Sequence, residues 1–235
     1  SLSAHIEGGS YGYLSAGIRG NIASKDRWNN QLSASYTRSD GYLRNKAGSL
    51  NADYRTAKVF YQGNYTDEDM MVRWHTGMSV KDFGSNTFYS AKFDDQFEHT
   101  FKTFTAIQAE NLRGRFHIRP SIYWNRNIDR FELFRGASNK YPFNYHRTDI
   151  YGVNLNAYFD WNLGRTAFAA ELRNEDLVSG NLGEPLSRPK HIHGTDRDYT
   201  VGLNRTNIQF VLEHNIILDR FTLSAGLTAV KNSQA

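Results

Sequence analysis

The sequence contains no cysteine. This absence excludes a disulfide framework, a zinc site with cysteine ligands and thiol chemistry. Proline is also scarce, with 4 residues among 235, and no Pro- or Ser-rich stretch divides the chain, so we expect one structural unit. No apolar run approaches the roughly 18 residues that a membrane-spanning helix needs. The first residues begin within an alternating pattern, so we expect no signal peptide in this chain.

Sequence motifs of catalysis are missing as well. We find no nucleophile elbow, no P-loop and no dinucleotide fingerprint, so we do not expect an enzyme. The formal net charge is +4, but basic and acidic residues are interspersed and form no basic stripe. Nucleic-acid binding is therefore not expected either.

Aromatic residues are abundant, at 14% of the chain, and the clearest repeating pattern runs over residues 70–81. One set of alternate positions there is apolar (Met70, Val72, Trp74, Thr76, Met78, Val80) and the other is mostly polar (Met71, Arg73, His75, Gly77, Ser79, Lys81). Side chains of a strand point alternately to opposite faces. A helix would scatter the charges around its axis, so this pattern predicts a strand with one apolar and one polar face.

The same alternation recurs along the chain and predicts about ten or eleven strands. The other predicted strands cover residues 2–7, 11–22, 31–38, 50–65, 96–110, 115–126, 150–161, 165–173, 208–216 and 221–229. The strand over 50–65 alternates less regularly, which suggests a bulge. Pro120 lacks an N–H group, so a bulge or weakened pairing is expected at that position.

The predicted connections alternate between short turns and long loops. Short turns lie near residues 25, 67, 112, 163 and 219, and long loops cover residues 39–49, 81–95, 131–147 and 175–198. The strands are longer than the five or six residues common in soluble sheets. This combination is typical of an antiparallel transmembrane β-barrel, whose tilted strands cross the hydrocarbon with about 9–11 residues.

The two faces of the predicted strands indicate which side meets water. The polar positions carry Arg, His, Glu, Asn and Gly along whole strands, as in a wide water-lined lumen, whereas the apolar positions are almost free of charge. Trp28, Trp161 and Phe221 lie beside short turns, where an aromatic girdle is expected. The alternative is a soluble β-sandwich with these apolar residues packed inside.

Three stretches resemble a known family. Residues 39–42 (Ser-Asp-Gly-Tyr), 61–65 (Tyr-Gln-Gly-Asn-Tyr) and 81–89 (Lys-Asp-Phe-Gly-Ser-Asn-Thr-Phe-Tyr) resemble the early barrel of TonB-dependent outer-membrane receptors, and are most similar to vitamin B12 (cobalamin) receptors of the Bacteroidetes type. The resemblance implies a barrel of about 22 strands that is filled by an N-terminal plug. Residues 1–235 would form a partial barrel of such a receptor, without the plug, the signal peptide or the C-terminal strands.

The resemblance also implies a function and partners. These are active uptake of a scarce, bulky nutrient, cobalamin or a siderophore-like ligand, across the outer membrane of a Gram-negative cell. The expected partners are outer-membrane lipid, the TonB complex through the plug, a small-molecule ligand and, as a further candidate, a surface lipoprotein. A passive porin-like barrel and a soluble carbohydrate-binding or adhesion module are the alternative functions.

Candidate ligand-binding residues lie in the predicted long loops. They are Phe83, Asn86, Phe88, Tyr89, Tyr141 and Tyr145. Aromatic and amide side chains above a barrel mouth suit a large, partly apolar ligand. The alternative is that these aromatic residues pack against one another and hold the loops in place.

Metal-like spacings are weak in this sequence. His191 and His193 are two residues apart and would share a face of an extended chain. Asp94 and Asp95 would offer oxygen ligands to calcium, although a full cage needs six to eight ligands. We therefore expect no metal site and no cofactor, with calcium in the loops as the alternative.

Overall fold

The computed structural model describes residues 1–24, 27–137 and 143–233. These residues contain no helix, and hence none long and apolar enough to cross a membrane. They form twelve strands: β1 (Leu2–Gly8), β2 (Leu14–Ser24), β3 (Trp28–Ser39), β4 (Tyr54–Thr66), β5 (Met70–Asn86), β6 (Gln96–Asn111), β7 (Phe116–Glu132), β8 (Phe143–Trp161), β9 (Gly164–Ser179), β10 (Glu184–His191), β11 (Asp198–Ile217) and β12 (Thr222–Asn232).

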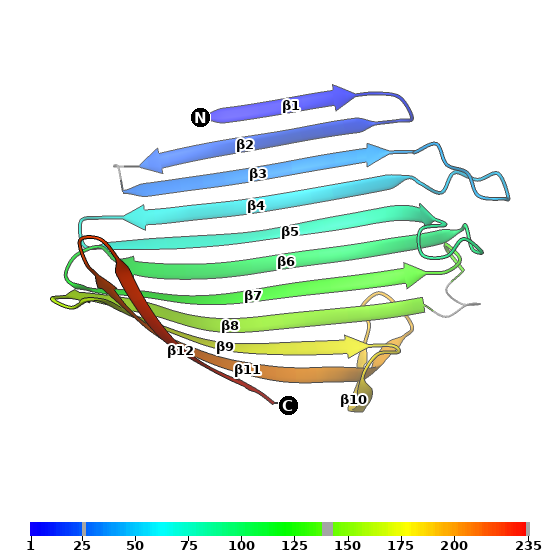
Figure 1. Cartoon of the computed structure of the whole chain (residues 1–235). Helices are drawn as coiled ribbons and strands as arrows, with labels where there is room; N and C mark the ends of the chain where they lie inside the picture. Colours follow the sequence, from blue (N-terminus) through cyan, green and yellow to red (C-terminus); the bar gives the residue numbers. More distant parts are fainter. Residues whose placement is uncertain (25–26, 138–142, 234–235) are drawn as a thin grey trace.

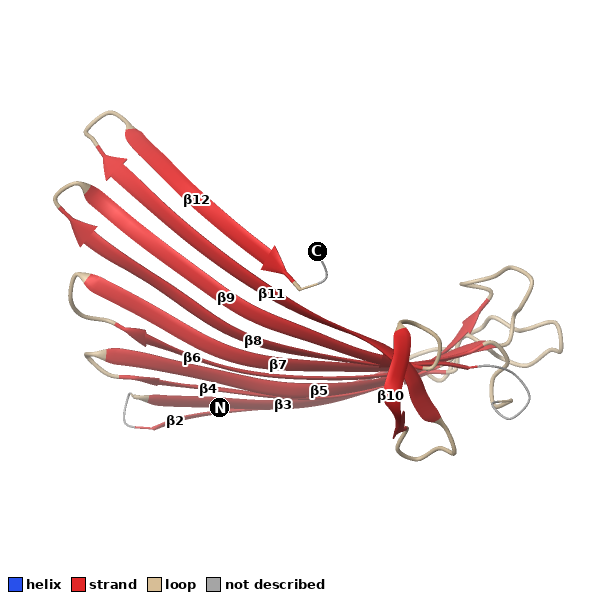
Figure 2. Ribbon diagram, turned by 90° about the horizontal axis from the view of Figure 1, so that it is seen from below, coloured by secondary structure: helices blue, strands red, loops and turns tan. Residues whose placement is uncertain are grey.

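All twelve strands belong to one antiparallel sheet, which confirms the predicted all-β fold. The strands from β1 to β9 pair in sequence order, β11 pairs with β9, and both β10 and β12 pair with β11. Figure 1 shows the short turns at one end of the sheet and the longer connections at the other. The sheet curves into an open trough, as Figure 2 shows.

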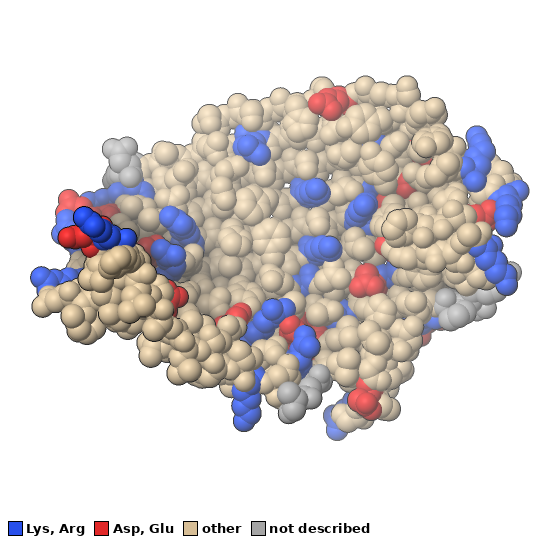
Figure 3. All heavy atoms as spheres, viewed as in Figure 1, with Lys and Arg blue, Asp and Glu red and all other residues tan. Residues whose placement is uncertain are grey.

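The ladder register sorts side chains onto two faces, because directly opposite residues of a ladder point to the same side. One register row is apolar across four strands and joins Ile122, Val153, Leu172 and Ile208. The next row is polar or small and joins Tyr123, Gly152, Arg173 and Asn207. Figure 3 shows the concave face, which is hollowed and carries Lys and Arg side chains. The polar rows therefore face inward and the apolar rows outward.

The outward face carries an apolar band. Its apolar positions run from Met70 to Val80 on β5, from Phe116 to Trp124 on β7 and from Tyr151 to Trp161 on β8, which is nine to eleven residues on these strands. Beyond it, at the end with the longer connections, the outward positions become charged at Asp82, Arg126 and Asp149. These lengths match the roughly 9–11 residues that a tilted strand needs to cross hydrocarbon.

The edge of this band runs obliquely to the strands. The register row that contains Tyr36, the last apolar outward residue of β3, reaches β11 at Gly202. On β11, however, the outward positions become apolar only from Ile208 onward, six residues after Gly202. Six residues correspond to about 20 Å along a strand, and the seven intervening strand spacings to about 34 Å, so the strands tilt by roughly 30° from the band normal. This tilt is close to that of membrane barrels.

The predicted loops were too long, because several strands continue beyond the apolar band. β5 extends to Asn86, β7 to Glu132 and β9 to Ser179, while β8 begins at Phe143 and β11 at Asp198. Backbone pairing continues in these segments, but charged side chains now occupy both faces. The two-residue alternation of polarity therefore disappears from the sequence although the strand persists.

Strand β10, which lies within the predicted loop 175–198, was not anticipated and raises the strand number to twelve. It pairs with the edge of β11 opposite β9, so residues 180–183 must cross β11. The backbones approach closely at the crossing: a Cβ on Gly183 would lie 2.4 Å from the carbonyl oxygen of Gly202. Gly183 also has a φ of 118°, which favours glycine.

The two expected irregularities have different outcomes. The β4 ladders show no register shift, so the bulge expected in residues 50–65 is absent, and β4 begins only at Tyr54. At Pro120, the pairing of β7 with β6 ends at the adjacent Ser121, while its pairing with β8 is continuous. The weakened pairing is therefore confirmed. The side chain of Asn111 takes over: it donates to the carbonyl of Phe116 and accepts from the N–H of Ile118.

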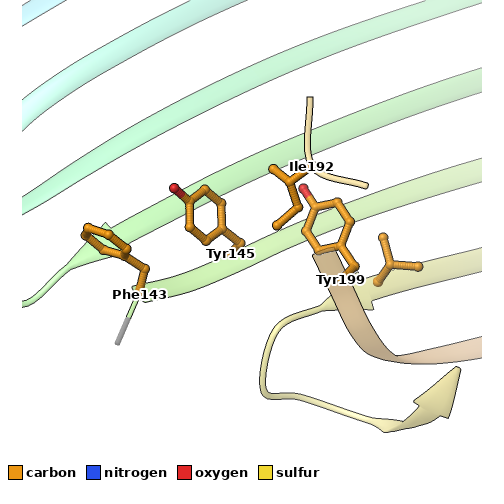
Figure 4. Packing of buried hydrophobic residues seen from close by; sticks show 5 residues of the cluster. Phe143, Tyr145, Ile192 and Tyr199 are labelled. Atoms are coloured by element: carbon orange, nitrogen blue, oxygen red, sulfur yellow. The ribbon is translucent and has the colours of Figure 1, made fainter. Parts of the chain in front are cut away.

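A small apolar core lies on the outward side beyond the band (Figure 4). It consists of Phe143, Tyr145, Val178, Ile192 and Tyr199. The residues come from β8, β9, the start of β11 and the turn between β10 and β11. The segment with β10 therefore covers apolar side chains of the sheet that would otherwise face water.

Candidate ligand-binding mouth

The inward face carries an aromatic row at the end with the longer connections. Tyr54 of β4, Phe83 of β5, Glu98 of β6 and Phe131 of β7 are joined in one register row, so their side chains share the inward face. This row lies where the inward wall meets the loops. We call these four residues, together with Phe88 and Tyr89, the mouth cluster.

Phe88 and Tyr89 come from the connection between β5 and β6 and extend the row. The Tyr89 ring packs edge-on against Phe131, with ring centroids 5.3 Å apart, and Phe88 packs edge-on against Tyr89 at 4.8 Å. Even so, Phe88 remains 79% exposed and Tyr89 54% exposed. The two rings are thus held by neighbours and still offer aromatic surface to a ligand.

Tyr89 is bound to the inward wall through Glu98. Burial of the phenol, together with its hydrogen bond to the Glu98 carboxylate, raises the pKa of Tyr89 to about 12. The phenol therefore stays protonated at neutral pH and acts as a donor.

The loops around the mouth are held by two buried amides. Asn51, 1% exposed, donates to the carbonyls of Asp94 and Gln96. Gln96 is fully buried, donates to the carbonyls of Ser90 and Phe93, and accepts from the N–H of Tyr89. These bonds satisfy backbone groups that a turn of this shape would leave unpaired. The loop that presents Phe88 and Tyr89 is therefore held by hydrogen bonds within the chain.

Arg135 connects a third loop to the first two. Its guanidinium forms two hydrogen bonds to the carboxylate of Asp53, at 2.5 and 2.8 Å, and donates to Asn51 at 3.2 Å. Its backbone N–H donates to the carbonyl of Asp95, and its side chain lies 4.6 Å from the centre of the Phe97 ring. The bidentate ion pair raises the pKa of Arg135, which stays charged.

Below the mouth, the inward wall is basic and rich in hydroxyl groups. Lys58, Lys81 and Lys102 lie on the adjacent strands β4, β5 and β6, on the inward face. Lys81 lies 4.5 Å from the centre of the Phe83 ring, directly beneath the mouth cluster. Two adjoining hollows of about 490 and 410 Å³ share Lys58 and Ser35 in their lining. Such a wall favours anionic or hydrogen-bonding groups of a ligand.

The structure brings three of the six predicted ligand residues together, and a fourth, Asn86, lies next to them in the chain. Phe83, Phe88 and Tyr89 belong to the mouth cluster, although Phe83 lies in β5 and not in a loop. Asn86 ends β5 with a φ of 45°, and its Nδ2 is buried without a hydrogen-bond partner among the described residues. The expected mutual packing of the aromatic side chains is present too, and it coexists with their exposure.

The other two predicted residues have different fates. Tyr145 lies in β8, in the register row of Arg130 and His99 on the outward face, and is buried in the apolar core. It does not join the mouth cluster. Tyr141 lies outside the described residues. Sequence reasoning missed Tyr54 and Phe131 because both stand at strand ends, where alternation alone does not indicate which strands adjoin.

The metal candidates have other partners. Asp94 accepts a hydrogen bond from the N–H of Lys46, and Asp95 accepts one from Asn45, so both carboxylates connect two loops. His191 lies 3.2 Å from Asp198, and both His191 and His193 are exposed on either side of the buried Ile192. Within the described ranges, no group of three or more His, Cys, Asp or Glu residues is arranged to hold a metal ion.

Solved structures resemble this chain closely in fold. The copper transporter OprC superposes with a TM-score of 0.69 at 13% identity, over 98% of this chain and 37% of OprC. The fold is therefore shared over nearly the whole of this chain. Two further solved structures, the siderophore receptor PirA and the ferric enterobactin receptor PfeA (a G324V mutant), both from Pseudomonas aeruginosa, each superpose with a TM-score of 0.64. Their identities to this chain are 12% and 11%, with 99% of this chain covered in each case.

The chain spans 36–38% of the length of these three proteins. No protein-family model matches the sequence, and no curated protein matches it. The similarity to receptor barrels therefore concerns the fold. The arrangement of side chains at the mouth fits binding, since it presents aromatic, amide and cationic groups around an open hollow.

Proposed function

We propose that this chain forms part of the barrel of a TonB-dependent outer-membrane receptor that takes up a scarce, bulky nutrient, with cobalamin as the first ligand to test. The observation that carries the proposal is the pairing of an outward apolar band, nine to eleven residues high, with an inward polar wall. A soluble β-sandwich would bury its apolar face, whereas here residues such as Val153 and Ile122 are about half exposed on it. The fold shared with a copper transporter and siderophore receptors supports the same class.

In this proposal the mouth cluster captures the ligand outside the cell. Exposed rings stack on apolar parts of the ligand, and the lysines beneath attract its polar or anionic groups. The described residues provide a wall without a gate, so the energy-dependent step is assigned to a plug and the TonB complex. A surface lipoprotein that covers the mouth is a further proposed partner.

Uptake of labelled cobalamin by cells that produce the full-length protein tests the proposal. We expect uptake that stops when the proton-motive force is collapsed. A porin-like barrel would continue to equilibrate the ligand without energy, so energy-independent uptake would contradict the receptor assignment. Competition by a ferric siderophore would redirect the ligand assignment while leaving the receptor class in place.

Binding by the purified full-length protein then tests the mouth. We expect Phe88→Ala combined with Tyr89→Ala to weaken ligand binding by about 10- to 100-fold, since two stacking rings are lost. The matched control is Tyr11→Ala with Tyr42→Ala, because these rings form another exposed pair at the same end, 5.6 Å apart. Equal losses in both double variants would argue against a specific mouth.

A further inference from the structure

Two arginines stand opposite each other just beyond the apolar band. Arg38 of β3 and Arg55 of β4 are directly paired in the ladder and both face outward. Each lies two residues from the last outward position of the band on its strand, Tyr36 on β3 and Ala57 on β4. Directly opposite like charges repel each other in a sheet. This pair therefore needs a nearby anion.

The protein supplies one carboxylate, Asp82, and of the two arginines only Arg55 contacts it. The Nε of Arg55 donates to Asp82 at 2.6 Å, but the Arg55 side chain remains 68% exposed. The Asp82 carboxylate is shared with His99, whose Nδ1 lies 2.6 Å from it. Arg38 is exposed and forms no hydrogen bond or ion pair with any of the described residues. The Asp82 carboxylate is thus shared by Arg55 and His99, and Arg38 is left without an acidic contact.

Three other arginines beyond the same edge of the band each contact an acid. Arg126 forms two hydrogen bonds to Asp149, at 2.7 and 3.1 Å, and Arg147 contacts the same carboxylate at 3.2 Å. Arg130 lies 3.0 Å from Glu132. Arg38 differs from these three arginines, because it contacts no acid of the described residues although it stands directly opposite Arg55.

We propose that Arg38 and Arg55 bind the phosphate of a lipid headgroup. A phosphate between two guanidiniums accepts paired hydrogen bonds from both and removes their repulsion. The position favours a lipid over free phosphate, because the arginines continue directly into the apolar band, where acyl chains of the same molecule would lie beside Tyr36. The inference rests on the proposed membrane location of that band.

Native mass spectrometry of the full-length protein in detergent, titrated with lipid A, tests this site. We expect Arg38→Gln with Arg55→Gln to weaken lipid A binding by about 10- to 30-fold, because each arginine near an anionic membrane surface strengthens binding by about 3- to 5-fold. The matched control is Arg19→Gln, which removes an exposed arginine from the inward face of β2. Two further probes are inorganic phosphate alone and phosphatidylcholine.

The outcomes separate the possibilities. Unchanged lipid A binding by the double variant, or an equal loss in Arg19→Gln, would overturn the site. Phosphate that binds as tightly as lipid A would identify a free-anion site and overturn the lipid assignment. The barrel itself is tested by whether the double variant still requires detergent, so a failed lipid site and a failed membrane location give different results.

Discussion

A single buried amide, Asn51, joins two of the loops at the mouth and accepts a hydrogen bond from the third. Asn51 is only 1% exposed, and replacing it with alanine leaves the backbone carbonyls of Asp94 and Gln96 without their donor. We expect Asn51→Ala to cost about 2–3 kcal/mol of local stability. Hydrogen exchange of the full-length protein should then show faster exchange in residues 87–96, with little change in the strands. Thr87→Ala, at an exposed position of the same loop, is the control, and equal exchange in both variants would refute this role.

Tyr89 gives a pH-dependent signal at the residue scale. Its pKa in the folded protein is raised to about 12 from 10.0. A raised pKa means that the folded state holds the proton more tightly. The stability that the protonated Tyr89 phenol contributes to the folded state is therefore complete below pH 10 and is lost between pH 10 and about 12. The ultraviolet difference titration between the wild-type protein and Tyr89→Phe should show one phenol with a midpoint near 12. A midpoint near 10 would show that the Glu98 contact does not form.

At the scale of the strand, neighbouring residues of β8 separate the two faces. Val153 lies within the apolar band, and Asn154 points inward. A lysine on the lipid face of a membrane barrel costs about 2–4 kcal/mol near mid-depth, whereas a lumen position tolerates it. We expect Val153→Lys to reduce folding into membranes and Asn154→Lys to leave it nearly unchanged, as measured by heat-modifiable migration on gels. The opposite ranking would contradict the assignment of Val153 to an apolar environment and of Asn154 to a water-lined one.

The elements predictable from sequence were those within the apolar band. Residues 70–81 and 115–126 alternate because apolar side chains occupy the outward face of the sheet and polar side chains occupy the inward face. The extensions at residues 82–86 and 127–132 carry polar groups on both faces, so nothing in their sequence distinguishes strand from loop. β10 escaped for a further reason: its short ladder with β11 depends on a chain crossing at Gly183 and Gly202, which is a tertiary relation.

At the scale of the whole molecule, Arg135 connects three loops through its hydrogen bonds. It contacts Asp53 and Asn51, more than 80 residues earlier in the chain. We expect Arg135→Ala to destabilise the loop arrangement by about 1–3 kcal/mol and to raise the dissociation rate of the ligand more than it lowers the association rate. Arg135→Lys should restore little, since lysine cannot form the bidentate pair. Stopped-flow binding with the full-length protein measures both rates. Full rescue by lysine would contradict the role of the bidentate Arg135–Asp53 pair.

The candidate site was only partly predictable for a related reason. Phe83, Phe88 and Tyr89 follow one predicted strand, so their proximity is local and visible in the sequence. Their partners Phe131 and Glu98 come from the next two strands, and strand order alone does not give the register. Tyr145 was predicted to bind ligand because it is an aromatic residue in a predicted loop. Its position in β8, however, places its side chain on the outward face.

The apolar core around Tyr145 and Val178 has a consequence for how deeply the protein can be immersed. Lower on the outward face, apolar side chains are open to whatever solvent surrounds them. Beyond the charged row of Arg126 and Asp149, comparable side chains are covered by the segment with β10. The chain thus shields these side chains from water by itself, and the covering segment adds bulk outside the sheet. In the proposed membrane location this bulk lies just beyond the apolar band, where it would oppose deeper insertion of this end of the sheet.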